Sequence, residues 1–188
     1  MAWLTRRHGC SVVGVDLMPS AARGTRLLFP GSTVVVASLT ALPFPAGAFG
    51  AAWTLGSLST IRETGCAARE LRRVLAPGGR LAVYDFVAAR AIPPGAPEAN
   101  VFAPPGALAG ELAAAGLTVL ASGRAPAVGP PPAAWREPML AVEREIGSHH
   151  GQDPRHRLEV AARAAFDRLR ASGCIVPWVL LLERPCSS

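Results

Sequence analysis

Short runs of apolar and β-branched residues alternate along this chain with segments of helical character, and this alternation constrains the fold more than any other feature. The runs are four to eight residues long, which is typical of buried strands rather than helices. Strands and helices that alternate through short connections form a parallel sheet with helices on both faces. We therefore predict a single α/β domain over residues 1–188, with a Rossmann-like, doubly wound and mainly parallel sheet.

Proline, glycine and polar capping residues set the bounds of the predicted elements. Strands are predicted at Ser11–Asp16, Thr33–Val36, Ala51–Leu55, Arg80–Phe86, Leu117–Ala121 and Cys174–Glu183. Helices are predicted at Met1–His8, Pro19–Leu28, Glu63–Leu75 and Pro104–Ala115. The first four strands should be mutually parallel, and the C-terminal strand should be antiparallel to its neighbours. Pro77-Gly78-Gly79 should form the turn before Arg80.

Two further helices are predicted between the last two strands, after a Pro-rich linker at Ala125–Ala134. The second of them should begin with Asp153 as N-cap and Pro154 at the first helical position. We interpret residues 134–172 as a lid-like helical insertion within the domain.

Composition limits the classes of partner. The net charge is +6, but all 19 basic residues are arginine and they are dispersed along the chain. A nucleic-acid-binding surface would show a basic stripe with stacking aromatics, so binding to nucleic acid is not expected. The longest apolar runs are too short to span a bilayer, and the first residues do not resemble a signal peptide. We expect a cytoplasmic protein that does not associate with membranes, and its oligomeric state stays open.

Cysteine and histidine spacing does not predict a metal site. The four cysteines form no C-x-x-C pair, so free thiols are expected. His149, His150 and His156 lie close in sequence, but no further ligand follows at a zinc-like spacing.

Four stretches carry a resemblance to one family. They are Gly9–Leu17 (GCSVVGVDL), Leu42–Phe49 (LPFPAGAF), Glu70–Val83 (ELRRVLAPGGRLAV) and Leu112–Val119. In order and spacing they resemble the class I S-adenosylmethionine-dependent methyltransferases, and most closely the methyltransferase type 11 branch typified by ubiquinone/menaquinone methyltransferases. The third stretch is the most specific, because it joins a long E-x-x-R-V-L match to an unusual turn.

The resemblance implies methyl transfer from S-adenosylmethionine to a small-molecule acceptor. It places Asp16 on the ribose hydroxyls of the cofactor, with Leu17, Ser38 and Leu39 flanking the adenine. Thr54 ends a strand at the carboxyl edge of the sheet, where ligands bind in open α/β folds. The residues alone leave an alternative role open for Asp16, in which it is a strand-end acid that caps the next turn. Trp53 is either ordinary core, which we favour, or part of a substrate wall.

The family opens with a strand and a G-x-G-x-G loop whose backbone amides approach the cofactor closely. Residues 1–188 contain no counterpart of this strand and loop, so the sequence predicts an N-terminally truncated version of the fold with its first strand missing. We weigh three explanations: the true start codon lies upstream, which we favour, the two flanking strands have closed up, or the fragment folds poorly.

No residue stands out as the catalytic base. Asp85 ends a strand and could accept a proton, but a structural acid is the alternative interpretation. His149 and His150 lie in the predicted lid, with a solvated helix end as the alternative. Two other functions remain open. One is a catalytically inactive methyltransferase relative that acts as a partner subunit. The other is a nicotinamide-binding oxidoreductase, since an acid placed at a strand end, as Asp16 is, also suits the ribose of such a cofactor.

Overall fold

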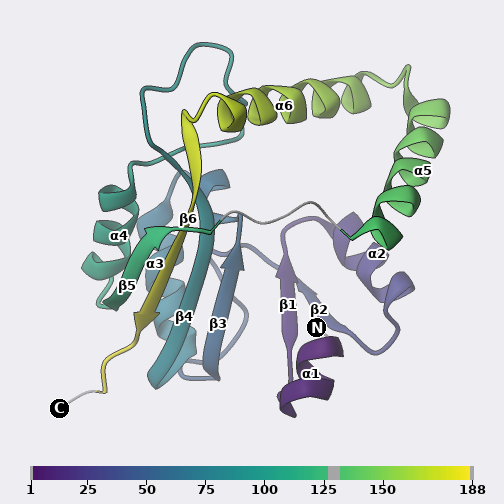
Figure 1. The fold of residues 1–188 in the computed structure, drawn as a ribbon. Helices are drawn as coiled ribbons and strands as arrows, with labels where there is room; N and C mark the ends of the chain where they lie inside the picture. Colours follow the sequence, from purple (N-terminus) through teal and green to yellow (C-terminus); the bar gives the residue numbers. More distant parts are fainter. Residues whose placement is uncertain (1, 127–131, 187–188) are drawn as a thin grey trace.

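The computed structural model describes residues 2–126 and 132–186 and contains the elements that the sequence predicts (Figure 1). The helices are α1 (Ala2–His8), α2 (Pro19–Leu28), α3 (Thr64–Val74), α4 (Pro105–Ala114), α5 (Ala133–His150) and α6 (Pro154–Ala171). The strands are β1 (Val13–Asp16), β2 (Thr33–Val36), β3 (Phe49–Leu55), β4 (Leu75–Ala88), β5 (Thr118–Arg124) and β6 (Ile175–Glu183), and a 3₁₀ turn, η1, spans Leu58–Thr60. Part of the predicted Pro-rich linker, residues 127–131, lies outside the described residues, and α5 begins at Ala133, inside that predicted linker.

The strands form two separate hydrogen-bonded sheets. β1 pairs in parallel with β2, and β3 pairs in parallel with β4. β6 is antiparallel to both β4 and β5, so the larger sheet has the order β3-β4-β6-β5. These directions confirm the predicted mixture of parallel strands and one antiparallel C-terminal strand.

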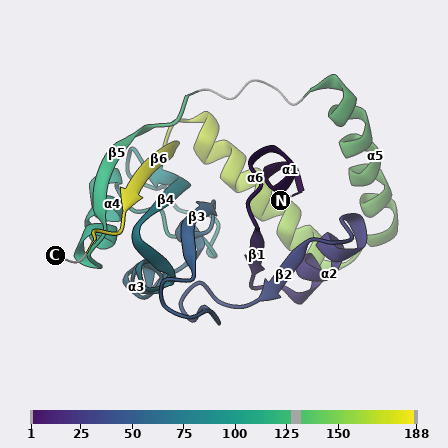
Figure 2. The same ribbon diagram turned by 90° about the horizontal axis from the view of Figure 1, so that it is seen from below.

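The two sheets are not joined to each other by backbone hydrogen bonds. β1 and β3 point the same way and face each other from the two sheets (Figures 1 and 2). Among the described residues, β1 pairs with β2 alone and β3 with β4 alone. The flanking strands have therefore not closed up, and this explanation for the missing first strand is wrong.

The main core lies between one face of the larger sheet and the helices α3 and α4. Alternate residues of β4, Leu81, Val83 and Val87, point into it, as period-two alternation requires. The α3 stripe meets them, because residues three and four apart lie on one side of a helix. The buried residues of α3 are Ala67, Ala68, Leu71 and Val74.

The opposite face of the larger sheet exposes large apolar side chains. Trp53 pairs with Ala82 of β4, which pairs with Leu181 of β6, so these three residues share one row. Trp53 is 60% exposed, and its neighbours on this face, Leu55 and Leu181, are exposed as well. The prediction that Trp53 is ordinary core was wrong, because no helix among the described residues covers this face of β3.

The Pro77-Gly78-Gly79 segment is a bulge within β4 rather than a turn before it. Phe49 of β3 pairs with Leu75, but Ala51 pairs with Arg80, so β4 carries three extra residues at this point. Gly78 has φ of 76°, a conformation that favours glycine. A Cβ on Gly79 would lie 2.8 Å from the Ala76 carbonyl oxygen, which explains the second glycine.

Helices α5 and α6 form an arch on the side of the strands' carboxyl ends (Figures 1 and 2). The Asp153 Oδ1 atom accepts a hydrogen bond of 2.8 Å from the Arg155 backbone amide, which confirms the predicted N-cap of α6. Near its other end α6 is anchored by Phe166, whose ring lies 4.8 Å from that of Phe86 on β4. No helix in the described part of the chain is both long and apolar enough to cross a membrane.

Candidate functional site

The candidate site lies at the carboxyl ends of the parallel strands, where parallel sheets of this type bind ligands. Asp16 ends β1, Ser38 and Leu39 follow β2, Thr54 lies at the end of β3, and Asp85 lies near the end of β4. All four strand ends point to the side spanned by the α5–α6 arch (Figure 1).

Asp16 is exposed, and its carboxylate is partly engaged. Its Oδ1 atom accepts a hydrogen bond of 2.8 Å from the Met18 backbone amide, which shapes the turn into α2. Its backbone carbonyl accepts from the Ala37 amide at 3.0 Å, so the ends of β1 and β2 are held together. In the described structure Oδ2 has no partner, so the carboxylate keeps an acceptor that faces solvent.

The three residues predicted to flank the adenine differ in environment. Leu17 is 69% exposed, which leaves its side chain available to a ligand. The Ser38 hydroxyl is 2.7 Å from that of Thr40 and also accepts from the Thr40 backbone amide, so it stabilises its own turn. Leu39 packs partly buried against the main core.

Thr54 is almost completely buried, with 3% of its surface exposed. Its hydroxyl has no hydrogen-bond partner among the described residues. Because it pairs with Val83 and points to the core side of the sheet, it lies on the other face from Trp53 and Leu55.

Asp85 has a structural environment. It is fully buried, and its Oδ2 atom accepts from the backbone amides of Leu58 and Ser59 at 2.7 and 3.2 Å. Its Oδ1 atom accepts from the Phe86 amide at 2.8 Å. Three amides therefore surround the carboxylate, and this geometry favours a role in fixing η1 after β3 over the role of a base.

His149 and His150 lie far from these residues in the chain, in the last turn of α5. The Nε2 atom of His149 is 3.0 Å from a carboxylate oxygen of Glu145, and both side chains are largely exposed. The ring centroids of His149 and His150 are 6.4 Å apart.

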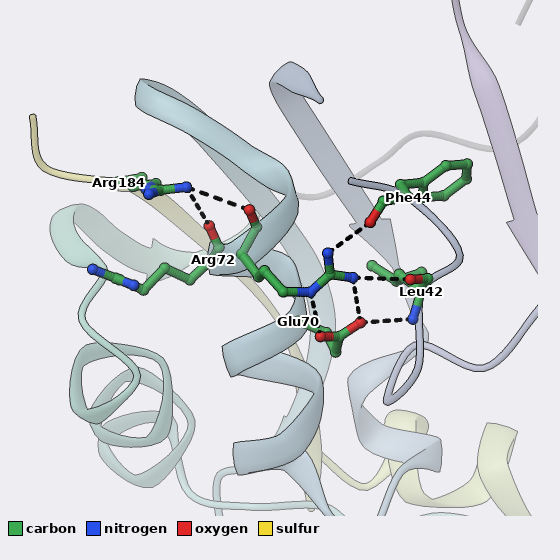
Figure 3. Close-up of polar contacts among 6 residues, drawn as sticks. Leu42, Phe44, Glu70, Arg72 and Arg184 are labelled. Carbon is green, nitrogen blue, oxygen red and sulfur yellow. Dashed lines mark hydrogen bonds and ion pairs between the residues drawn. The ribbon is translucent and has the colours of Figure 1, made fainter. Parts of the chain in front are cut away.

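An ion pair on α3 holds the loop between β2 and β3, and the sequence analysis did not single it out. The Arg73 guanidinium contacts both carboxylate oxygens of Glu70, at 2.7 and 2.8 Å, and donates to the carbonyls of Leu42 and Phe44 at 2.9 and 2.6 Å (Figure 3). The Glu70 carboxylate in turn accepts from the Leu42 amide at 2.7 Å. The i,i+3 spacing of the E-x-x-R motif was the signal, because it places both side chains on one helix face.

Arg184 completes this arrangement from the C-terminal side. Its Nη1 atom donates to the carbonyls of Arg72 and Arg73 at 3.3 Å each (Figure 3). The same atom also donates to the carbonyl of Leu75. These carbonyls belong to the last turn of α3 and the residue after it, which have no intrahelical donors. The end of α3, the bulge in β4 and the loop with Leu42 are thus held as one unit.

Glu70→Gln should weaken this unit in a pH-dependent way. The hydrogen bond from Arg73 is the main cause that lowers the pKa of Glu70 below its ordinary value of 4.5, although burial opposes it. A lowered pKa means that the pair stabilises the fold above the ordinary pKa, and that this stabilisation is lost as the pH falls through the lowered value. Urea unfolding should show the variant roughly 1 kcal/mol less stable at pH 7, with the difference shrinking as the pH falls through the lowered pKa of Glu70. Glu137→Gln, at an exposed site on α5, is the control, and a difference that stays constant with pH would contradict the assignment.

Known proteins resemble this chain in two respects, the sequence of its first half and its overall fold. Residues 1–83 match the family described as "Methyltransferase domain". Over 90 residues the chain is 39% identical to the demethylmenaquinone methyltransferase of Thermus thermophilus, a match that covers 43% of this chain and 39% of that protein. The chain thus spans well under half of the length of this curated relative.

Two solved structures share the fold over nearly the whole chain. The [4+2]-cyclase SpnF superposes with a TM-score of 0.71 at 23% identity, over 99% of this chain and 70% of that one. The geranyl diphosphate C-methyltransferase of Streptomyces coelicolor, determined with S-adenosyl-L-homocysteine, gives 0.64 at 16% identity, over 98% and 66%. Residues 1–83 therefore match a methyltransferase domain, and the whole chain shares the fold of these two solved structures, both of which agree with the resemblance seen in the sequence.

Proposed function

We propose that this chain is the core of an enzyme that transfers the methyl group of S-adenosylmethionine to a small-molecule acceptor. The single observation that carries the proposal is Asp16, an exposed carboxylate at the carboxyl end of β1 with Oδ2 open to a ligand. A carboxylate so placed can accept hydrogen bonds from both hydroxyls of a ribose. The match of residues 1–83 to methyltransferase domains supports the same assignment, because a fold alone does not fix an activity and one neighbour is a cyclase.

The described residues fit the nucleoside half of this cofactor. Asp16 would hold the ribose, and the exposed Leu17 side chain would cover one face of the adenine. The turn at Ser38, tied to β1 through the Asp16 carbonyl, would bound the same pocket. The partly buried Leu39 would support this turn from the core side. Residues 1–188 provide no glycine-rich loop for the methionine half.

The bound cofactor supplies an electrophilic methyl group, and the chain's own residues position the acceptor and exclude water. Asp85 accepts hydrogen bonds from the amides of η1 and so fixes η1 beside the end of β3. Its effect on the site is therefore indirect. We therefore assign it to positioning, while His149 and His150 remain the candidates for accepting a proton from the acceptor. The demethylmenaquinone methyltransferase likeness supports a small molecule as that acceptor.

Asp16→Ala should weaken cofactor binding at least tenfold. The measurement is calorimetric titration of S-adenosylmethionine into the 188 residues preceded by an added apolar strand and G-x-G-x-G loop. A hydrogen bond to a charged group contributes roughly 1.5–3 kcal/mol, which corresponds to about one to two decades in the dissociation constant. Glu98→Ala, at an exposed loop position, should leave binding unchanged. Equal affinities for wild type and Asp16→Ala would remove the ribose assignment and the observation on which the proposed function rests.

A further inference from the structure

The smaller sheet has an open edge along β2. β1 pairs with one edge of β2, and no strand in the described part of the chain pairs with its other, outer edge. β2 spans Thr33–Val36, so all four of its residues are β-branched, the type that favours strands. An open edge of this kind is a template on which a strand of another molecule can pair.

The backbone groups of Val34 and Val36 point to this outer edge. The Ala37 amide donates to the Asp16 carbonyl at 3.0 Å, so residue 37 bonds toward β1. In a parallel pair, successive residues of a strand direct their N–H and C=O groups to opposite edges. Val35 therefore also bonds toward β1, whereas Val34 and Val36 present their amides and carbonyls to the outside.

An arginine from α2 covers part of this edge. The Arg26 Nη2 atom donates to the Val34 carbonyl at 2.5 Å. Arg26 lies in the last turn of α2, and α2 packs against β2 (Figure 2). The guanidinium thus occupies an acceptor that a neighbouring strand would use. It also places beside the edge a positive charge that arginine does not lose in proteins.

Exposed apolar side chains accompany the edge. Leu27, Leu28 and Phe29 follow Arg26 directly in the chain and are 74%, 74% and 58% exposed, and Val36 of β2 is 44% exposed. Burial of such side chains would add to the hydrogen bonds of a strand pair. Without a cover, the edge would therefore favour association with a second strand.

We propose that Arg26 blocks the pairing of β2 with the β2 of a second copy of this chain. The edges of two copies are identical, so they would pair antiparallel about a two-fold axis, with the same surface used on both copies. Such pairing would require both Arg26 side chains to leave their Val34 carbonyls. It would also bring the two guanidinium charges together, and like charges opposite each other destabilise a strand pair. The proposal does not rest on the proposed function, because no cofactor or acceptor takes part.

The test compares Arg26→Ser with Arg23→Ser by light scattering over a series of protein concentrations. Both arginines are exposed on α2, both variants lose one positive charge, and neither adds apolar surface. Only Arg26 bonds to the Val34 carbonyl among the described side chains. Arg26→Ser should form a dimer with a dissociation constant at least roughly tenfold below that of the wild type, because the freed backbone groups then bond across the two-fold axis. Arg23→Ser, and Arg26→Lys with its cation retained, should have the wild-type mass at every concentration.

A second substitution locates the association on β2. Val36→Pro removes an amide that points to the outer edge, where proline is tolerated because β1 does not use that amide. Added to Arg26→Ser, it should restore the wild-type mass. Val36→Lys keeps the amide but places a charge on the edge, and it should act in the same way if the proline variant does not fold. Circular dichroism checks the fold of each variant, and Arg26→Gln replaces Arg26→Ser if serine prevents folding.

Three results would overturn the proposal. The first is a wild-type mass for Arg26→Ser at every concentration. The second is equal association of Arg26→Ser and Arg23→Ser, which would assign the effect to the lost charge alone. The third is association of Arg26→Ser that neither substitution of Val36 reverses, which would place the contact on another surface, such as the sheet face with Trp53. Failure of the proposed function would show instead in the Asp16→Ala titration, which does not involve this edge.

Discussion

Asp85→Ala should lower the free energy of unfolding by about 3–5 kcal/mol. The Asp85 carboxylate accepts hydrogen bonds from the backbone amides of Leu58, Ser59 and Phe86. Asp85 itself is fully buried. Alanine leaves these donors without an acceptor, and an unsatisfied buried polar group costs about 1–3 kcal/mol. The expected loss is a large fraction of the 5–15 kcal/mol that is typical of a whole domain. Urea unfolding followed by circular dichroism measures it.

Asp85→Asn separates the hydrogen bonds from the charge. Asparagine retains one acceptor oxygen of similar geometry, so it should lose less stability than alanine and remain measurable if alanine does not fold. Asp167→Ala is the control, since Asp167 lies on the surface of α6 in an exposed ion pair with Arg170, and such pairs contribute little. A loss below about 1 kcal/mol for Asp85→Ala would contradict the structural role and return Asp85 to the candidate bases.

Local chemistry predicted the elements well because their ends depend on single residues. α2 spans the predicted Pro19–Leu28, with proline at its start. α1 ends before Gly9, which has φ of 66°. Asp153 caps α6 as expected. The family resemblance also predicted the topology, and the observed strand directions agree with that prediction.

Tertiary features were harder to predict, because they depend on which surfaces meet. Trp53 follows the strand pattern of a core residue, yet its face of β3 has no covering helix in the described part of the chain. The sequence around Asp85 is equally compatible with a catalytic base and with a structural acid. Only the three backbone amides around its carboxylate distinguish the two roles. Arg73 belongs to a polar helix face in the sequence, but it binds loop carbonyls 29 and 31 residues away.

An added apolar strand and G-x-G-x-G loop before Met1 should strengthen S-adenosylmethionine binding by about two to four decades relative to the 188-residue chain. On the proposed function Asp16 holds the ribose, but residues 1–188 contain no glycine-rich loop for the methionine end. Hydrogen bonds to a charged carboxylate contribute roughly 1.5–3 kcal/mol each, so two of them amount to about 3–6 kcal/mol. β1 and β3 run in the same direction, and each has one edge without a partner strand among the described residues, so one added strand could pair with both in parallel. Calorimetry of the two chains should therefore show weak or no binding for the shorter one.

A second extended chain separates the effect of the loop from that of the strand. Replacing the loop glycines with valine keeps the added strand but prevents the close approach of backbone amides that only glycine allows. If the amides carry the affinity, this variant should gain stability toward urea as the first extended chain does, yet bind the cofactor no better than the 188-residue chain. Full affinity in the valine variant would show that the strand acts by ordering Asp16 instead. Micromolar binding by the 188-residue chain itself would mean that another of its segments contacts the methionine end.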